Sequence, residues 1–279
     1  MRRVLMSLGT CLTLAACGTE MTVPLPDAEP EHAARFDIVT TVVACGDLVT
    51  TDVRLEADLA CPDDALIVDA DGLRINLNGH TISGNNTGEG ITVRGRANVT
   101  IYGGTVRNFT TGVFVAQSTG VVVKDNWFTA NREGVFLNGA SGNVVKSNVA
   151  WQNTLRGIML RPTASGVPST NNVVVGNTLT DNPSGILIFG QSGNTLKENT
   201  ISGSTVGAFD LTGGGGSANE IKGNVLSSSA AGIKFGAGWN GNFIIGNTIQ
   251  SNTCGLAGPS ALNTYKDNVF TSNSTDICP

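Results

Sequence analysis

The stretch Asn143-Val144-Val145-Lys146-Ser147-Asn148-Val149-Ala150-Trp151-Gln152-Asn153 returns with the same spacing at Asn172-Val173-Val174-Val175-Gly176-Asn177-Thr178-Leu179-Thr180-Asp181-Asn182. Successive asparagines are five positions apart in both copies. A self-similar period of this length is typical of a solenoid, in which each repeat forms one coil. The middle asparagine recurs at Asn126, Asn148, Asn177, Asn199, Asn224, Asn247 and Asn268, with Gly104 in its place one coil earlier.

Two further features share this period. A second asparagine column stands five residues earlier, at Asn143, Asn172, Asn194, Asn219, Asn242 and Asn263. A third follows at Asn131, Asn153, Asn182, Asn252 and Asn273. A glycine followed by an apolar residue recurs every 22 to 28 positions, at Gly90, Gly112, Gly134, Gly157, Gly185, Gly207, Gly232 and Gly255.

The segments between these breakers are too short for helices and are rich in Val, Ile and Thr, so they predict short strands, three in each coil. Apolar positions are fixed relative to the middle asparagine: Val145 and Ala150 in one coil correspond to Val174 and Leu179 in the next. We expect each asparagine to adopt the left-handed turn conformation and to bond its counterpart one coil along. These asparagines are therefore interpreted as structural.

The repeat Asn-x-[Val/Ile/Leu]-x-x-Asn-x-[Phe/Ile/Leu] followed by Gly-[Val/Ile], together with the string Leu77-Asn78-Gly79-His80-Thr81-Ile82-Ser83-Gly84, resembles the pectate-lyase-like superfamily. Within it, the resemblance is to short-repeat members, which include periplasmic NosD-like proteins and bacterial surface proteins. It covers about three quarters of the chain and implies an all-β, right-handed parallel β-helix solenoid of about nine coils with three short strands per coil. One fold hosts many functions, so the activity is less constrained.

The first residues resemble a lipoprotein export signal. Arg2 and Arg3 precede an apolar stretch that ends in Leu14-Ala15-Ala16-Cys17. The prediction is a signal peptide over 1–16, lipid attachment at Cys17, a flexible tether over 17–36, an N-terminal cap over 37–63 and the β-helix over 64–279. Gly18 is not a retention residue in such proteins, which places the chain in the outer membrane or at the cell surface. The alternative is an ordinary signal peptide with an incidental Cys17.

The net charge and the cysteine spacing limit which partners and metals the chain is expected to bind. Of 17 basic and 22 acidic residues, removal of Arg2 and Arg3 leaves 15 against 22, a formal charge of −7. This balance disfavours nucleic acid as a partner. Cys45 with Cys61 and Cys254 with Cys278 are the expected disulfides of an exported chain, although three connectivities are formally available. Neither pair has metal-site spacing, so no metal is expected.

The strand that starts at each glycine carries an outward row of apolar side chains. Phe114, Phe136, Met159 and Leu187 form this row, and Asn138, Arg161 and Phe189 lie two residues further along their strands. Such a surface suits stacking of sugar rings, and in the superfamily that the chain resembles this face holds the polysaccharide groove. The alternative is that residues 36–60 or another subunit cover the row.

Candidate chemistry lies beside two insertions. Pro162 to Thr170 and Thr212 to Ser217 are predicted to wall a pocket over Phe189 and Gln191, with Trp239 nearby. The alternative is that Gly213 to Gly216 marks a disordered excursion. Arg161, Asp210 and Lys234 are the candidate catalytic residues at the pocket. No column offers acids on consecutive coils, which favours a lyase or epimerase over a hydrolase. A lyase would call for Ca²⁺, and no other cofactor is expected.

Two further features have mainly structural interpretations. A lysine row comprises Lys124, Lys146, Lys197, Lys222 and Lys266, which would either bind an acidic glycan or form a solvated face. His80 aligns with the middle asparagine column and is predicted to begin it.

The sequence thus predicts an exported, monomeric β-helix that binds, and in one version modifies, extracellular acidic polysaccharide. The alternative is a non-catalytic interaction protein of the cell envelope.

Overall fold

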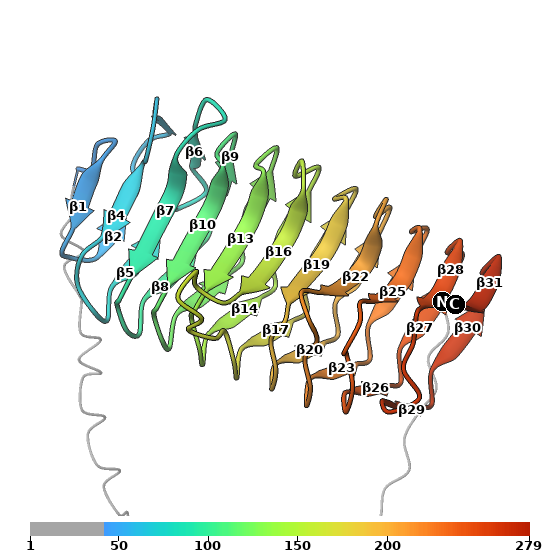
Figure 1. Ribbon diagram of the computed structural model, residues 1–279. Coiled ribbons are helices and arrows are strands. Elements are labelled where there is room, and N and C mark those ends of the chain that lie inside the picture. The colour runs from blue at the N-terminus through green and yellow to red at the C-terminus, as the bar shows by residue number, and fades with distance from the viewer. Residues whose placement is uncertain (1–41) are drawn as a thin grey trace, which may run out of the picture. The chain divides into compact units, whose positions relative to one another are not determined.

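The computed structural model describes residues 42–279, which form a solenoid of short parallel strands (Figure 1). All named strand pairings are parallel, and each strand pairs with the strand three elements later, so that three sheets run along the axis. We name them sheets A, B and C. Their 11, 10 and 10 strands correspond to about ten turns, which confirms the predicted fold and lies close to the nine coils expected.

Sheet A contains the longest strands and comprises β1 (Asp47–Val49), β4 (Leu66–Val68), β7 (Glu89–Arg94), β10 (Thr111–Ala116), β13 (Glu133–Asn138), β16 (Arg156–Arg161), β19 (Ser184–Phe189), β22 (Gly207–Thr212), β25 (Ala231–Phe235), β28 (Cys254–Ala257) and β31 (Thr275–Cys278). Sheet B comprises β2 (Val53–Arg54), β5 (Arg74–Asn76), β8 (Thr100–Tyr102), β11 (Val122–Lys124), β14 (Val144–Lys146), β17 (Val173–Val175), β20 (Thr195–Lys197), β23 (Glu220–Lys222), β26 (Phe243–Ile245) and β29 (Thr264–Lys266). Sheet C comprises β3 (Leu59–Ala60), β6 (Thr81–Ser83), β9 (Thr105–Arg107), β12 (Trp127–Thr129), β15 (Val149–Trp151), β18 (Thr178–Thr180), β21 (Thr200–Ser202), β24 (Val225–Ser227), β27 (Thr248–Gln250) and β30 (Val269–Thr271).

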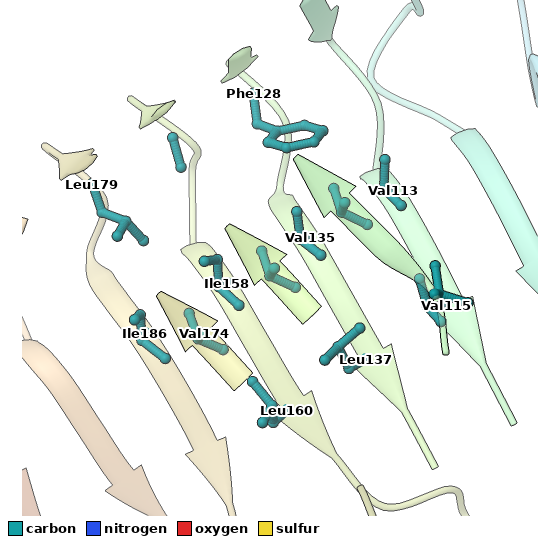
Figure 2. Close-up of a cluster of buried hydrophobic side chains, with 14 of the residues drawn as sticks. Val113, Val115, Phe128, Val135, Leu137, Ile158, Leu160, Val174, Leu179 and Ile186 are labelled. Carbon is teal, nitrogen blue, oxygen red and sulfur yellow. The ribbon is translucent and has the colours of Figure 1, made fainter. Parts of the chain in front are cut away.

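The core consists of apolar columns that run along the axis. Val135 lies in register with Val113 on one side and Ile158 on the other, and all three are at most 1% exposed. Figure 2 shows this stacking together with Phe128 and Leu179 from sheet C. Because each inward side chain packs on the same position of its neighbours, the apolar residues of every coil are buried although no coil has a core of its own.

The asparagine columns form buried ladders, as predicted. Asn177 Oδ1 accepts hydrogen bonds from the backbone N and the Nδ2 of Asn148, at 2.9 and 3.0 Å. Asn177 Nδ2 in turn donates to Val145 O at 2.9 Å and to Asn199 Oδ1 at 3.0 Å. Each ladder side chain therefore satisfies backbone groups at the turns, where the sheet hydrogen bonds end.

The expectation that these asparagines adopt the left-handed conformation is wrong. Positive φ falls on the residue before every one of them except Asn263: Ser147 (53°) precedes Asn148, and Gly176 (63°) precedes Asn177. The left-handed residue turns the chain at the corner between two sheets, and the side chain of the asparagine that follows points into the interior, where its amide bonds both neighbouring coils.

The glycine column is also shifted in one coil. Gly185 pairs in register with Ala208, because Gly207 lies opposite Ser184. Asp210 consequently joins the outward column between Leu187 and Lys234, a placement that the sequence alignment of the repeats had missed. Elsewhere the glycine is required: a Cβ on Gly134 would lie 2.5 Å from Gly157 O.

Both predicted disulfides are present. Cys45 is bonded to Cys61 and Cys254 to Cys278, with Cα atoms 5.4 and 6.2 Å apart. Each bond joins segments at one end of the described solenoid. Cys45 lies just before β1, and residues 47–60 of the predicted cap contribute one strand to each sheet.

The predicted signal peptide, Cys17, the tether over 17–36 and the first residues of the cap lie outside the described residues. Over residues 42–279, no helix has the length and apolar content that crossing a membrane would require.

Candidate functional site

A cleft of about 400 Å³ lies on the outer face of sheet A. Its floor is formed by Phe114, Phe136 and Met159, which occupy the same position on β10, β13 and β16. The rings of Phe114 and Phe136 meet edge to face, with centroids 5.1 Å apart. Phe114 and Met159 are only 5% and 4% exposed, because neighbouring side chains pack around them, whereas Phe136 is half-buried. The cleft thus has a firmly packed apolar floor.

One wall of the cleft carries a buried carboxylate between two arginines. Glu133 begins β13, and its side chain is 6% exposed. Arg156, in register on β16, donates from Nη1 to Glu133 Oε1 at 2.8 Å. Arg132 Nε lies 3.9 Å from the same oxygen. Burial raises the pKa of Glu133 above its usual value, and the charges of Arg132 and Arg156 oppose this rise only in part.

A carboxyl with a raised pKa gives its stabilisation at low pH and loses it as pH rises through the folded-state pKa. Replacing Glu133 by glutamine removes this dependence. We therefore expect the Tm of Glu133→Gln, relative to the Tm of the unchanged protein, to increase from about pH 4 to pH 8. Thermal melts across that range measure the difference, and Glu220→Gln on sheet B is the matched control. If the Tm of the variant minus the Tm of the unchanged protein fell with increasing pH, the charges of the arginines would affect the pKa of Glu133 more than burial does.

Two arginines lie over aromatic rings on the other side of the floor column, Arg161 in the wall of the cleft and Arg94 beside it. The Arg94 guanidinium lies 4.4 Å from the centroid of the Phe114 ring, and that of Arg161 lies 5.2 Å from the Phe189 ring. Arg94 also forms an ion pair with Glu89, at 3.2 Å. No ion pair of Arg161 is found within the described residues. The contact with the Phe189 ring holds the Arg161 guanidinium and leaves its N–H groups available to bind an anion.

The structure brings part of the predicted groove together. Phe114, Phe136, Met159, Phe189 and Arg161 line the cleft. Leu187 continues the floor column but is 4% exposed. Asn138 is in register with Arg161, and its Oδ1 is buried without a hydrogen-bond partner.

The other two candidate catalytic residues lie further along the axis. Asp210 is on β22 and Lys234 on β25, while Arg161 is on β16, with β19 between β16 and β22. Asp210 is 6% exposed and accepts a hydrogen bond from Ser184 Oγ at 3.1 Å. Its Oδ1 lies 3.9 Å from Lys234 Nζ. Asp210 and Lys234 thus form a pair of their own beyond the cleft.

The sequence had not pointed to Glu133, Arg132, Glu89 or Thr111. Glu89, Thr111, Glu133 and Arg156 each stand directly before the repeated glycine, and the strand register places them in one outward column. That fixed offset from the glycine was the available signal.

The two insertions pack against the solenoid. Ser169 N donates to the Gln191 side chain at 2.5 Å. Trp239 is 1% exposed and lies directly against Gly216, where an added Cβ would be 2.9 Å from its ring. Trp239, which was expected near the pocket that the insertions were predicted to wall, has its ring in the core.

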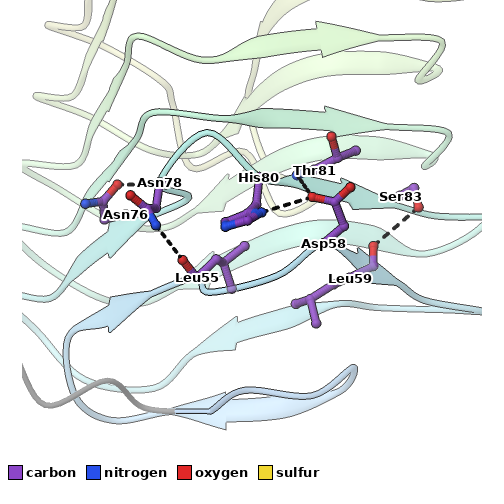
Figure 3. A network of polar contacts seen from close by, with 8 residues as sticks. All are labelled: Leu55, Asp58, Leu59, Asn76, Asn78, His80, Thr81 and Ser83. Atoms are coloured by element: carbon purple, nitrogen blue, oxygen red, sulfur yellow. Dashed lines mark hydrogen bonds and ion pairs between the residues drawn. The ribbon is translucent and has the colours of Figure 1, made fainter.

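Residues 42–60 do not cover the row, because they form the first coil, at the end of the sheets beyond β4. His80 occupies the register of the asparagine column, but it does not begin the ladder. Its Nδ1 lies 3.2 Å from Asp58 Oδ1, an oxygen that also accepts from Thr81 N (Figure 3). The hydrogen bond from Thr81, followed by that of His80, lowers the pKa of Asp58.

The lysine row is in register on sheet B, with Lys124 opposite Lys146 and Lys197 opposite Lys222. Three of its members pair with nearby acids: Lys124 with Asp125, Lys222 with Glu220 and Lys266 with Asp267. This face is therefore less strongly positive than the row alone suggests.

Comparison with known proteins relates the chain to β-helices. Residues 64–218 match the family model described as the right handed beta helix region, and residues 163–278 match that of the periplasmic copper-binding protein NosD. No curated protein was found to match the chain.

Similar solved structures include the periplasmic alginate epimerase AlgG, with a TM-score of 0.60 and 14% identity over 79% of this chain and 73% of that one. The A-module of the Azotobacter vinelandii mannuronan C-5 epimerase AlgE4 has a TM-score of 0.58 and 15% identity, covering 81% and 82% of the two chains. The alginate lyase of Paenibacillus sp. str. FPU-7 has a TM-score of 0.53 and 13% identity, covering 82% and 100%. At these identities the similarity establishes a shared fold.

The described residues do not fit a copper site. Within residues 42–279, no group of three or more His, Cys, Asp or Glu side chains is placed to hold a metal ion. The four cysteines of this region are in disulfides, and Met159 is packed into the floor of the cleft. Soft sulfur donors and clustered imidazoles, which copper prefers, are thus lacking in this part of the chain.

Proposed function

Since the chain belongs to the right-handed β-helix family, which its match over residues 64–218 establishes, we propose that it is an exported protein that binds acidic polysaccharide in the cleft on sheet A. The solved β-helices it resembles include alginate epimerases and an alginate lyase. NosD and AlgG, which are described as periplasmic, support export. Attachment to the membrane through lipid on Cys17 belongs to the same proposal.

The observation that carries this proposal is the combination of an apolar floor with arginines in one cleft. Arg132, Arg156 and Arg161 line it, although the whole chain is acidic, with a formal charge of −5. Arginine is the side chain best suited to bind carboxylates, because its planar guanidinium donates two parallel hydrogen bonds. An aromatic floor contacts the C–H face of a sugar ring. A polymer of uronic acids presents both features at each residue.

A second candidate function is modification of the bound polymer, and Glu133 favours it. A carboxyl whose pKa is raised exchanges protons nearer to neutral pH than an ordinary one. Arg132 and Arg156 would neutralise the uronate carboxylate, which makes the neighbouring ring proton easier to remove. In a lyase reaction, the Glu133 carboxylate takes this proton, a C=C bond forms as the C–O bond at the next ring carbon breaks, and the leaving sugar oxygen takes a proton from water.

Binding is tested by retardation in native gels that contain polygalacturonate or alginate. We expect Phe136→Ala to raise Kd by roughly 2- to 10-fold, the contribution of one stacking ring. The control is Lys146→Ala with Lys197→Ala on sheet B, which should bind like the unchanged protein. Loss of binding in the lysine variant, with Phe136→Ala unaffected, would move the site to sheet B and overturn the proposal.

Lyase action is tested by the ultraviolet absorbance of unsaturated uronate products. A signal that disappears in Glu133→Gln, while binding is retained, would support modification at this site. Binding without product from any acidic polymer, and without exchange of the ring proton with solvent, would make the protein a binding protein only.

A further inference from the structure

Two exposed tryptophans lie on sheet C, away from the cleft. Trp127 on β12 is 57% exposed and Trp151 on β15 is 43% exposed. Their strands are adjacent, and Trp127 is in register with Val149 while Trp151 is in register with Thr129. The two residues are therefore diagonal neighbours, with Cα atoms about 8 Å apart from the usual strand spacing and rise.

Both rings point outward for a structural reason. The middle residue of each strand is part of the core: Phe128 is 1% exposed and Ala150 is 2% exposed. Alternation along a strand then places Trp127 and Trp151 on the outer face. Neither ring is needed to fill the core, so nothing in the packing of the solenoid accounts for two large aromatic side chains here.

Most residues around the tryptophans are polar and uncharged. Trp127 lies between Thr105 and Val149 in its column, and Trp151 lies between Thr129 and Thr180. The same face continues with Thr178, Thr200 and Ser202. Among the outward positions of the sheet C strands from β6 to β30, all within residues 42–279, Arg107 is the one charged residue, and it lies opposite Thr129. Sheet B, in contrast, carries lysines and Glu220 at its outward positions.

We propose that this face of sheet C, centred on Trp127 and Trp151, is a second binding surface and that its ligand is an uncharged polysaccharide. An indole ring offers a broad apolar surface to the C–H face of a sugar. The threonine and serine hydroxyls both donate and accept hydrogen bonds, as sugar hydroxyls do. Arg107 is the one cation at the outward strand positions of this face, so a uronate polymer finds a single carboxylate partner on it, whereas three arginines line the cleft. This difference separates the ligand of this face from that of the cleft.

The spacing of the two rings suits a linear polymer. They lie on adjacent coils and are offset along the strands, so one chain crossing the sheet obliquely contacts both. A flat sheet with hydroxyls on both sides of the rings leaves such a chain unobstructed. This surface does not depend on the function proposed for the cleft.

The probe is intrinsic fluorescence of the full chain titrated with dextran, galactomannan and soluble β-glucan. The chain has three tryptophans, and the third, Trp239, is 1% exposed, so a change in emission on binding reports Trp127 and Trp151. We expect saturable quenching or a blue shift with at least one of these polymers. In native gels that contain the bound polymer, the double variant Trp127→Ala with Trp151→Ala should have a Kd about 10-fold or more above that of the unchanged protein.

Two controls keep the test specific. Val269→Ala removes an exposed apolar side chain from the far end of the same column and should bind like the unchanged protein. Trp127→Phe with Trp151→Phe should restore most of the affinity. Equal binding by the double alanine variant would overturn the proposal, as would the absence of binding to all three polymers. Sedimentation that shows self-association, lost in the double alanine variant, would overturn it too, since the face would then be an interface between copies of this chain.

Discussion

Replacing Asn177 by alanine is expected to lower the free energy of unfolding by about 2–6 kcal/mol. The change removes the acceptor of the Asn148 backbone N–H and the donor to Val145 O, both in the buried interior. Each buried backbone group left without a partner costs about 1–3 kcal/mol. For a chain of this length we expect Tm to fall by roughly 10 °C, as measured by circular dichroism.

Asn268→Ala is the matched control, because Asn268 belongs to the same column. Its Oδ1 accepts from Asn247 N at 3.0 Å, and its Nδ2 donates to Ile244 O at 2.7 Å. It lies in the last coil and is only partly buried, so water reaches the groups that alanine would expose. We expect a loss of about 1 kcal/mol or less. Equal losses in the two variants would show that burial of the ladder is not what stabilises the coils.

The double variant Arg132→Ala with Arg161→Ala is expected to bind acidic polysaccharide more weakly than the unchanged protein. Each arginine is substantially exposed, so its contact with a carboxylate is worth about 1 kcal/mol. Removing both arginines should weaken the binding free energy by about 2 kcal/mol, which raises Kd for polygalacturonate roughly 30-fold. The affinity of the unchanged protein should also fall steeply with added salt, and the double variant should show a weaker salt dependence.

Arg107→Ala with Arg74→Ala is the matched control, because it removes the same number of positive charges from outside the cleft. We expect this variant to bind almost as well as the unchanged protein. If both double variants lost affinity equally, binding would depend on net charge alone, and the cleft would have no specific part in it. Melting temperatures of all variants separate binding defects from unfolding.

Much of the fold follows from spacing alone. In a solenoid, a residue contacts its counterpart one period away, so Asn148, Asn177 and Asn199 could be placed together without knowledge of the rest of the chain. The same applies to the apolar columns, whereas the two disulfides were expected from export and from the position of each cysteine pair at one end of the repeats. Local geometry was harder to predict: the left-handed conformation lies on Ser147 and Gly176 rather than on the asparagines, because the turn and the inward amide need two different residues.

The candidate site could be predicted only in part. The floor column of Phe114, Phe136 and Met159 follows from the repeat, since its members keep a fixed distance from the glycine. Glu133, in contrast, is one acid among many in the sequence. Its burial depends on the packing of Phe136 and on the reach of Arg132 and Arg156, which are side-chain conformations that a repeat does not specify.

By itself, the sequence determined the architecture: coils in register, three ladders of asparagine and an outward apolar row, all consequences of a period that brings equal residues together. Only the tertiary structure decided which charged groups meet. The pairs Glu133–Arg156 and Asp210–Lys234 depend on side-chain packing between neighbouring coils. The reason is physical: backbone register repeats from coil to coil, whereas burial and ion pairing depend on the particular side chains next to one another.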